Sequence, residues 1–216
     1  IGSDRIAIVY QSIDPIYFTP ATAEEKAAVA SRYSLPERYV LCVGTIEKRK
    51  NQELLIKALP AVDAGMHAVI VGRCTPYADE LETLARQTAV AERVHFLSGV
   101  PTGDLPAIYQ SAAVFCFPSV YEGFGLPIAE ALASRVPVIA ATGSCLEEAG
   151  GPDSIYISPD DDAALAGAVN RLCTDSALRE RTVARGAEYV RRFSDEAMAR
   201  GLMDVYKSVL NNPPNP

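Results

Sequence analysis

The sequence predicts an α/β fold, a doubly wound parallel sheet of the Rossmann-like type. Short apolar runs recur along the chain, and most are continuously apolar rather than alternating with polar residues, as expected for strands covered on both faces. Helical patterns separate these runs, which favours right-handed crossovers between parallel strands. In such a sheet ligands bind at the carboxyl ends of the strands, so the loops that follow the strands are the expected place of a site.

The individual elements follow from these patterns. Strands are predicted at residues 6–10, 39–43, 68–71, 94–97, 113–117, 138–141 and 155–157. Helical patterns cover residues 51–62, 77–87, 104–111 and 163–173. From residue 160 onward the chain is predicted to be mostly helical, and Ser194 is suited to cap a last helix that ends near Leu210.

Length and composition limit the classes of function. A chain of 216 residues can bury the core of one ordinary domain, and it has no long uncharged run that would span a membrane. The first residues lack the basic region of a signal peptide. A net charge of −7 disfavours a nucleic-acid surface and a docking surface for anionic lipid.

The five cysteines are scattered and form no Cys-x-x-Cys pair. Metal and disulfide roles are therefore disfavoured, and small buried thiols in a reducing compartment are the better interpretation. We expect a cytoplasmic protein on this ground.

A glycine-rich turn between a predicted strand and a predicted helix is the most informative stretch. Gly123 and Gly125 let the backbone approach a ligand closely, and Pro127 suits the first turn of a helix. The free N–H groups around Phe124, Gly125 and Leu126 would attract an anion such as a phosphate.

Two glutamates, Glu122 and Glu130, bracket this turn. Carboxylates beside a phosphate would repel it, so we expect them to accept hydrogen bonds from neutral hydroxyls, most naturally those of sugars. The turn and the two carboxylates together indicate a nucleotide-sugar. The alternative is a generic crossover whose glycines only permit a tight turn.

The block from Glu122 to Glu130 resembles the signature of the retaining glycosyltransferases of the GT-B fold, the glycosyl transferases group 1 family. That signature reads Glu-Gly-x-Gly-Leu-Pro, with a second Glu eight residues after the first, as here. The resemblance implies the C-terminal, donor-binding half of a GT-B fold, and it implies transfer of a sugar from a nucleoside-diphosphate sugar without a metal cofactor. It also implies that Glu122 binds the transferred sugar and that Glu130 binds the ribose diol of the nucleotide.

A basic loop follows the predicted strand at residues 39–43. Gly44 ends the strand, and three cations at residues 48–50 precede a helix start, where a diphosphate would gain from both the helix dipole and the charges. A solvated basic turn is the alternative interpretation.

The same loop resembles its counterpart in the family, which has an Arg directly after the Gly and a Lys five residues later. Lys50 matches that Lys and is implied to be catalytic, together with Glu122. Thr45 stands where the Arg is expected, so Arg49 is the candidate substitute. The form Gly-Thr-Ile-Glu-x-Arg-Lys-Asn is similar to mannosyltransferase-like members, which makes GDP-mannose the first choice of donor, with UDP-sugars close behind.

Two further segments resemble the family. Residues 96–100, Phe-Leu-Ser-Gly-Val, resemble a loop that lies against the nucleobase, and Val100 is its implied apolar contact. Residues 6–18 resemble the interdomain connection, in which Asp14 and Phe18 keep their places while Gln-Ser replaces the usual Asn-Gly.

These resemblances imply a domain plan. Residues 1–20 are predicted to be a strand and loop like the interdomain connection, residues 21–210 the donor-binding domain, and residues 211–216 a frayed tail. The partner is then a missing N-terminal acceptor domain, to which any peripheral membrane contact would belong. We expect the chain alone to bind a nucleoside diphosphate but to transfer nothing, and a stand-alone nucleotide-sugar-binding module is the alternative.

Other functions are disfavoured. A Rossmann dehydrogenase would need Gly-x-Gly-x-x-Gly at an early strand–helix turn, which is absent. A glycosidase would need two carboxylates about 5 to 9.5 Å apart but neither a phosphate turn nor a basic loop. His67 and His95 fall at strand starts, away from the ligand edge, and the acidic run at residues 160–162 is typical of a helix start rather than a metal site.

Overall fold

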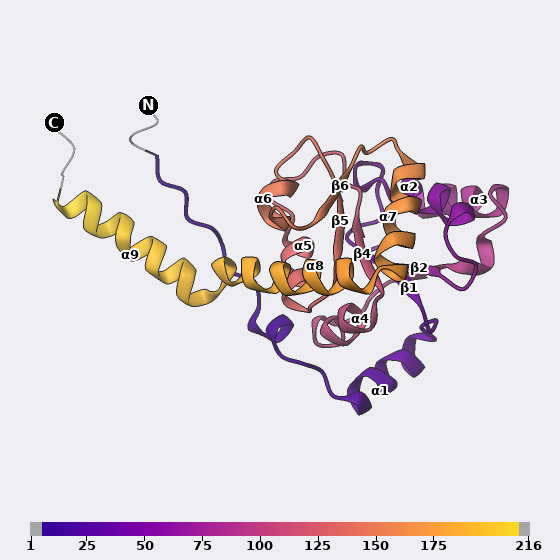
Figure 1. Cartoon of the computed structure of the whole chain (residues 1–216), viewed down its shortest axis with the longest axis horizontal. Coiled ribbons are helices and arrows are strands. Elements are labelled where there is room, and N and C mark those ends of the chain that lie inside the picture. Colours follow the sequence, from indigo (N-terminus) through magenta and orange to yellow (C-terminus); the bar gives the residue numbers. More distant parts are fainter. Residues whose placement is uncertain (1–5, 212–216) are drawn as a thin grey trace.

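A six-stranded sheet forms the centre of the structure, a computed structural model that describes residues 6–211 (Figure 1). The strand order is β3-β2-β1-β4-β5-β6, and every neighbouring pair is parallel. The strands are β1 (Tyr39–Val43), β2 (His67–Val71), β3 (Val94–Leu97), β4 (Val114–Phe117), β5 (Val138–Ala141) and β6 (Ile155–Ile157). This arrangement confirms the predicted doubly wound, Rossmann-like fold class.

Nine α-helices and six short 3₁₀ turns join the strands within the described range. The helices are α1 (Ala23–Tyr33), α2 (Gln52–Ala58), α3 (Tyr77–Gln87), α4 (Leu105–Ser111), α5 (Leu126–Ala133), α6 (Leu146–Gly150), α7 (Asp162–Thr174), α8 (Ser176–Tyr189) and α9 (Asp195–Asn211). The 3₁₀ turns are η2 (Pro15–Phe18), η3 (Lys48–Lys50), η4 (Leu59–Ala61), η5 (Ala91–Arg93), η6 (Thr102–Asp104) and η7 (Val190–Phe193).

Both faces of the sheet are buried, which explains the continuously apolar strands. Successive side chains of a strand point to opposite faces. In β1, Leu41 enters one core cluster, while Val40 and Cys42 enter the other. Residues of α4, α5 and α6 complete the first cluster, and residues of α2, α3 and α7 complete the second.

The strand predicted at residues 6–10 is wrong. This segment has no regular secondary structure, and Ile6 and Ile8 are 64% and 75% exposed. Val9 lies against α9 instead, since a side chain at Gly201 would approach it within 3.2 Å. A helix offers no free backbone groups to pair with a strand, so an apolar run beside it does not become one.

The remaining predicted elements lie close to their predicted ranges. Helix α2 is shorter than predicted because Pro60, which lacks an N–H, turns the chain into η4. Helix α1 was not predicted, although Thr22 and Glu25 form a capping box at its start.

The C-terminal third is helical, as predicted. Asp161 caps α7 by accepting a hydrogen bond from the Ala164 N–H at 2.7 Å, which agrees with a helix-start role for the acidic run. Ser194 accepts a bond from the backbone three residues on at 3.2 Å, and α9 then leaves the sheet beside the N-terminal segment (Figure 1). Helix α9 includes Asn211, and the rest of the predicted tail, residues 212–216, lies outside the described residues.

The two histidines lie at the amino-terminal ends of their strands, away from the carboxyl-end loops. His67 begins β2 and His95 lies in β3, and their ring nitrogens Nδ1 and Nε2 are 2.9 Å apart. Burial lowers the pKa of both imidazoles. This contact between neighbouring strands agrees with the structural role predicted for both.

The cysteines are free thiols. Cys42 and Cys116 are buried in the sheet, as expected for small apolar side chains, whereas Cys74 is exposed. Between residues 6 and 211, no group of three metal-binding side chains is placed to hold an ion. No helix in the same range combines the length and the apolar character needed to cross a bilayer.

Candidate functional site

The strand order reverses between β1 and β4, and an open α/β sheet binds its ligands in the crevice at such a point. The loop after β1 carries Gly44 and the basic turn η3, and the loop after β4 carries Glu122. Asn51 joins these loops, because its Nδ2 donates to the Pro118 carbonyl at 3.0 Å and to the Pro159 carbonyl at 2.7 Å. The predicted basic loop and the predicted glycine turn therefore meet at the reversal.

Glu122 lies at the centre of an ion-pair cluster, which we define as Lys50, Arg49, Ser119 and Glu122. Lys50 Nζ is 2.6 Å from Glu122 Oε1, and Arg49 Nη1 is 3.0 Å from Oε2. The Ser119 hydroxyl donates to Oε1 at 2.6 Å. The Lys50 side chain is only 13% exposed, so Lys50 is not part of a solvated basic turn, whereas Arg49 is 42% exposed.

The cluster fixes the charge of the carboxylate. Burial alone would raise the pKa of Glu122, but hydrogen bonds from Lys50, Ser119 and Arg49 outweigh it and hold that pKa below its usual value. Glu122 is therefore ionised at neutral pH and can accept further hydrogen bonds from hydroxyl donors. The Lys50 ammonium also lies 5.0 Å from the centre of the Phe117 ring, which helps to hold it in place.

An open pocket of about 380 Å³ lies at the carboxyl ends of β1, β2 and β3. Its lining includes Gly44, Thr45, Gly72, Arg73, Gly99 and Val100. Gly44 also borders the ion-pair cluster, since a side chain at Gly44 would meet Lys50 Cε at 3.5 Å. The predicted nucleobase contact Val100 thus lines the pocket, and the predicted phosphate ligand Lys50 lies next to one of its lining residues, Gly44.

The loops after β1 and β2 touch through their backbones. A side-chain carbon at Gly72 would lie 1.9 Å from the Gly44 carbonyl oxygen, so only glycine fits there. The Gly44 N–H donates to the Val71 carbonyl at 2.9 Å, and the Ile46 N–H donates to the Arg73 carbonyl at 3.0 Å. These bonds hold the floor of the pocket.

The glycine-rich turn leads directly into α5. Gly125 has a φ of +105°, a conformation that side chains rarely adopt. Among the described residues, none accepts a hydrogen bond from the N–H groups of Gly123, Phe124, Gly125 or Leu126. The turn therefore presents several free donors at a helix start, as the sequence predicted.

The Phe124 side chain has a separate role. Its ring packs against Tyr10 and Phe193, with ring centres 5.8 and 5.2 Å away. The Phe124 ring therefore ties the turn to η7 and to the N-terminal segment, and its backbone N–H remains the group available to a ligand.

Glu130 has different neighbours from Glu122. Its Oε2 accepts a hydrogen bond from the Tyr109 hydroxyl of α4 at 2.8 Å. Burial raises the pKa of Glu130, although hydrogen bonds from Tyr109 and Tyr17 oppose the shift. Cations therefore surround the Glu122 carboxylate, whereas the Glu130 carboxylate is held by a tyrosine hydroxyl.

Comparison with known proteins shows the family. The family model described as "Glycosyl transferases group 1" matches residues 24–189. The chain belongs to this family. Every residue that the sequence assigned to the site lies within the matched range.

Individual relatives agree with this membership. O-antigen chain mannosyltransferase B of Escherichia coli is 31% identical over 210 residues, which are 95% of this chain and 55% of that protein. Anabaena Alr3699/HepE, solved in complex with UDP and glucose, has a TM-score of 0.83 at 20% identity over 93% of this chain and 56% of that chain. The C-terminal domain of the glycosyl transferase group 1 family protein LpcC from Francisella tularensis has a TM-score of 0.73 at 24% identity over 85% of this chain and 100% of that chain.

These likenesses confirm the predicted C-terminal domain of a GT-B fold. The chain spans about half the length of the curated relatives that it matches.

Some residues that the structure brings to the site of this group 1 domain were not predicted from the sequence. Ser119 completes the ion-pair cluster and stands only three residues before Glu122, which was an available signal. Tyr109 gave no local signal, because its role depends on a carboxylate of another helix. Gly72 directly follows a predicted strand, which indicates a loop at the ligand edge, but its close approach to the Gly44 backbone left no signal in the sequence.

Proposed function

We propose that this chain is the donor-binding domain of a retaining glycosyltransferase, which binds a nucleoside-diphosphate sugar and transfers its sugar to an acceptor held by a further, N-terminal domain. The observation that carries the proposal is the 2.6 Å contact between Lys50 and Glu122 beside the free amides of α5. It supplies donors for a diphosphate and an ionised acceptor for sugar hydroxyls in one crevice. The acceptor class, by family resemblance, is a lipid-linked or polysaccharide intermediate.

The proposed chemistry uses Lys50 and the amides of the glycine turn. Breaking the anomeric bond expels a nucleoside diphosphate, so negative charge grows on its β-phosphate. Preorganised N–H donors and a cation stabilise that charge more in the transition state than in the ground state. An ammonium has three donors, so Lys50 can contact Glu122 and a phosphate oxygen together. Arg49 is the proposed second cation, and no metal ion is required.

Glu122 is proposed to hold the transferred sugar and not to attack it. Both of its oxygens are engaged by Lys50, Arg49 and Ser119, which suits an acceptor of hydrogen bonds better than a nucleophile. The acceptor hydroxyl would then attack from the face of the leaving group, which retains the anomeric configuration. Free thiols support a reducing compartment, and we propose that the domain works in the cytoplasm.

GDP-mannose is the proposed donor. The basic loop resembles that of mannosyltransferase-like members, and the E. coli relative is named a mannosyltransferase. We expect GDP-mannose to raise the Tm of this chain more than UDP-glucose or the ADP- and TDP-sugars in a thermal-shift screen. A larger shift with UDP-glucose would make the donor a UDP-sugar, and no shift with any of them would contradict the proposed function.

The Glu122→Gln variant tests the role of this carboxylate. The amide keeps the shape but loses a negative charge and one acceptor, so affinity for GDP-mannose should fall about 10-fold relative to affinity for GDP. GDP affinity itself should stay nearly unchanged, because GDP lacks the sugar whose hydroxyls Glu122 is proposed to bind. Calorimetric titration of both ligands measures the ratio, and equal weakening of both would place Glu122 outside the sugar site.

A further inference from the structure

We propose that Tyr109 and Tyr17 are positioning residues that hold the Glu130 carboxylate for the ribose diol of the bound nucleotide. This inference rests on the proposed nucleotide-sugar function and extends it by two residues that lie outside the glycine turn and the basic loop.

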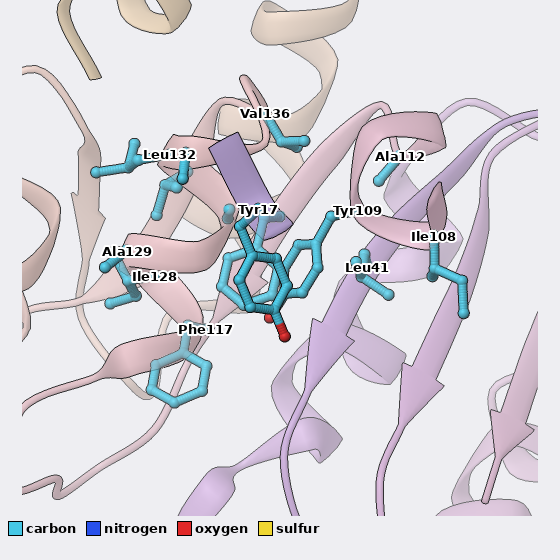
Figure 2. Packing of buried hydrophobic residues seen from close by; sticks show 14 of the residues in the cluster. Tyr17, Leu41, Ile108, Tyr109, Ala112, Phe117, Ile128, Ala129, Leu132 and Val136 are labelled. Atoms are coloured by element: carbon cyan, nitrogen blue, oxygen red, sulfur yellow. The ribbon is translucent and has the colours of Figure 1, made fainter. Parts of the chain in front are cut away.

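The two tyrosines form a rigid support for Glu130. The Tyr109 hydroxyl donates to Glu130 Oε2 at 2.8 Å, and Tyr109 is 0% exposed while Tyr17 is 3% exposed. Their rings meet edge to face with centres 5.6 Å apart, and Figure 2 shows them next to each other with their hydroxyl groups at the same end. The Tyr109 ring also packs against Phe115 at 5.3 Å, so it has little freedom to turn.

The helices direct this group toward the pocket. Glu130 stands four residues after Leu126 in α5, and Tyr109 stands four residues after Leu105 in α4. Side chains in a helix lean toward its N-terminus, so both groups point toward the first turn of their own helix. Leu105 lines the pocket at the carboxyl ends of the strands. The first turn of α4 thus borders the pocket, and the lean of both side chains directs the Glu130 carboxylate toward this end of the sheet.

The hydrogen bonds of Glu130 leave room for a diol. A carboxylate offers about four acceptor positions, and the Tyr109 hydroxyl accounts for one of them, with the Tyr17 ring packed beside Tyr109. The two hydroxyls of a ribose can fill the other positions. Glu130 is only half-buried, so these positions are not sealed from a ligand.

The surroundings of Glu130 disfavour a charged side chain, and a purely structural role would not require one. No Lys or Arg between residues 6 and 211 forms an ion pair with it, and burial makes its charged form unfavourable. An apolar side chain or a glutamine would avoid this cost. A carboxylate held only by neutral donors fits a site that is completed by further hydroxyls.

The test compares a ribonucleotide with its dideoxy form. Wild type should bind GDP more tightly than 2′,3′-dideoxy-GDP in calorimetric titrations. In Tyr109→Phe, GDP affinity should fall about 2- to 10-fold while the affinity for the dideoxy form is unchanged, because only the ribose contact depends on Glu130. Tyr17→Phe should also lower the affinity for GDP and leave that for the dideoxy form unchanged. If one of the two variants fails to fold, the other still provides the test.

Tyr39→Phe is the matched control. Tyr39 is also buried, but its hydroxyl donates to the Ile108 carbonyl at 2.6 Å and not to Glu130. Its loss should lower the Tm and leave the ribose preference unchanged. If Tyr109→Phe and Tyr17→Phe both keep the preference for GDP over 2′,3′-dideoxy-GDP while Glu130→Gln loses it, the positioning role is overturned. The proposed donor site would still stand. Absence of any GDP or UDP binding by wild type would instead overturn the proposed function.

Discussion

Replacing Gly72 by alanine is expected to lower the free energy of unfolding by about 2–3 kcal/mol and to weaken nucleotide binding. The added carbon would lie 1.9 Å from the Gly44 carbonyl oxygen, a backbone atom that cannot move without breaking the hydrogen bonds between the two loops. Both loops line the pocket, so separating them also changes the surface that a nucleotide would contact. Urea denaturation measures the first effect and calorimetric titration with GDP the second.

Gly167→Ala is the matched control for this substitution. Gly167 is exposed within α7, and a side chain there would meet no atom within 4 Å. Alanine should leave stability unchanged or raise it by up to about 1 kcal/mol, because glycine is a poor helix former. A Gly72→Ala variant as stable as Gly167→Ala would show that the two loops do not approach as described.

The sheet was predictable because burial on both faces leaves a strong pattern in the sequence. Strands such as β1 and β4 have apolar side chains at every position, as expected for short strands that are covered on both faces. The segment at residues 6–10 has a similar apolar pattern, yet its partner is α9 rather than a strand edge. Hydrophobicity indicates that a segment is covered, and it does not indicate by what.

The residues of the candidate site also differ in whether the sequence predicts them. Glu122, Lys50 and Gly44 stand in local motifs beside the ends of strands, so their sequence neighbours indicate where they lie. Tyr109 lies on the buried face of α4 and has no motif around it, and only the packing of α4 against α5 brings it to Glu130. A supporting residue on another helix, such as Tyr109, is therefore visible only in the fold, whereas Ser119 stands close to Glu122 in the sequence itself.

The separate surroundings of the two carboxylates give them different electrostatic behaviour. The pKa of Glu122 is held below its usual value by a cationic cluster, whereas burial raises that of Glu130. One site is thus organised by charge and the other by neutral hydrogen bonds. Removing a charge should therefore have its largest effect at the cluster around Glu122.

Lys50→Met is expected to have the largest effect on binding. Methionine keeps most of the length of the side chain but removes the ammonium that lies 2.6 Å from Glu122 and faces the proposed diphosphate. Loss of a charged hydrogen bond costs about 1.5–3 kcal/mol, so GDP affinity should fall about 10- to 150-fold. The free energy of unfolding should also fall, because the half-buried Glu122 loses its shortest ion pair.

Lys48→Met separates this contact from the general charge of the loop. Lys48 belongs to the same turn, η3, but its side chain is exposed, and within the described residues it forms no ion pair. The two variants change the net charge equally, so an electrostatic effect of the whole loop would weaken GDP binding by similar factors in both. A specific phosphate contact predicts a large loss for Lys50→Met and a change below about 3-fold for Lys48→Met, because exposed charges at a distance are screened by salt. Calorimetric titrations at two salt concentrations distinguish these results, and equal losses in the two variants would remove Lys50 from the proposed diphosphate site.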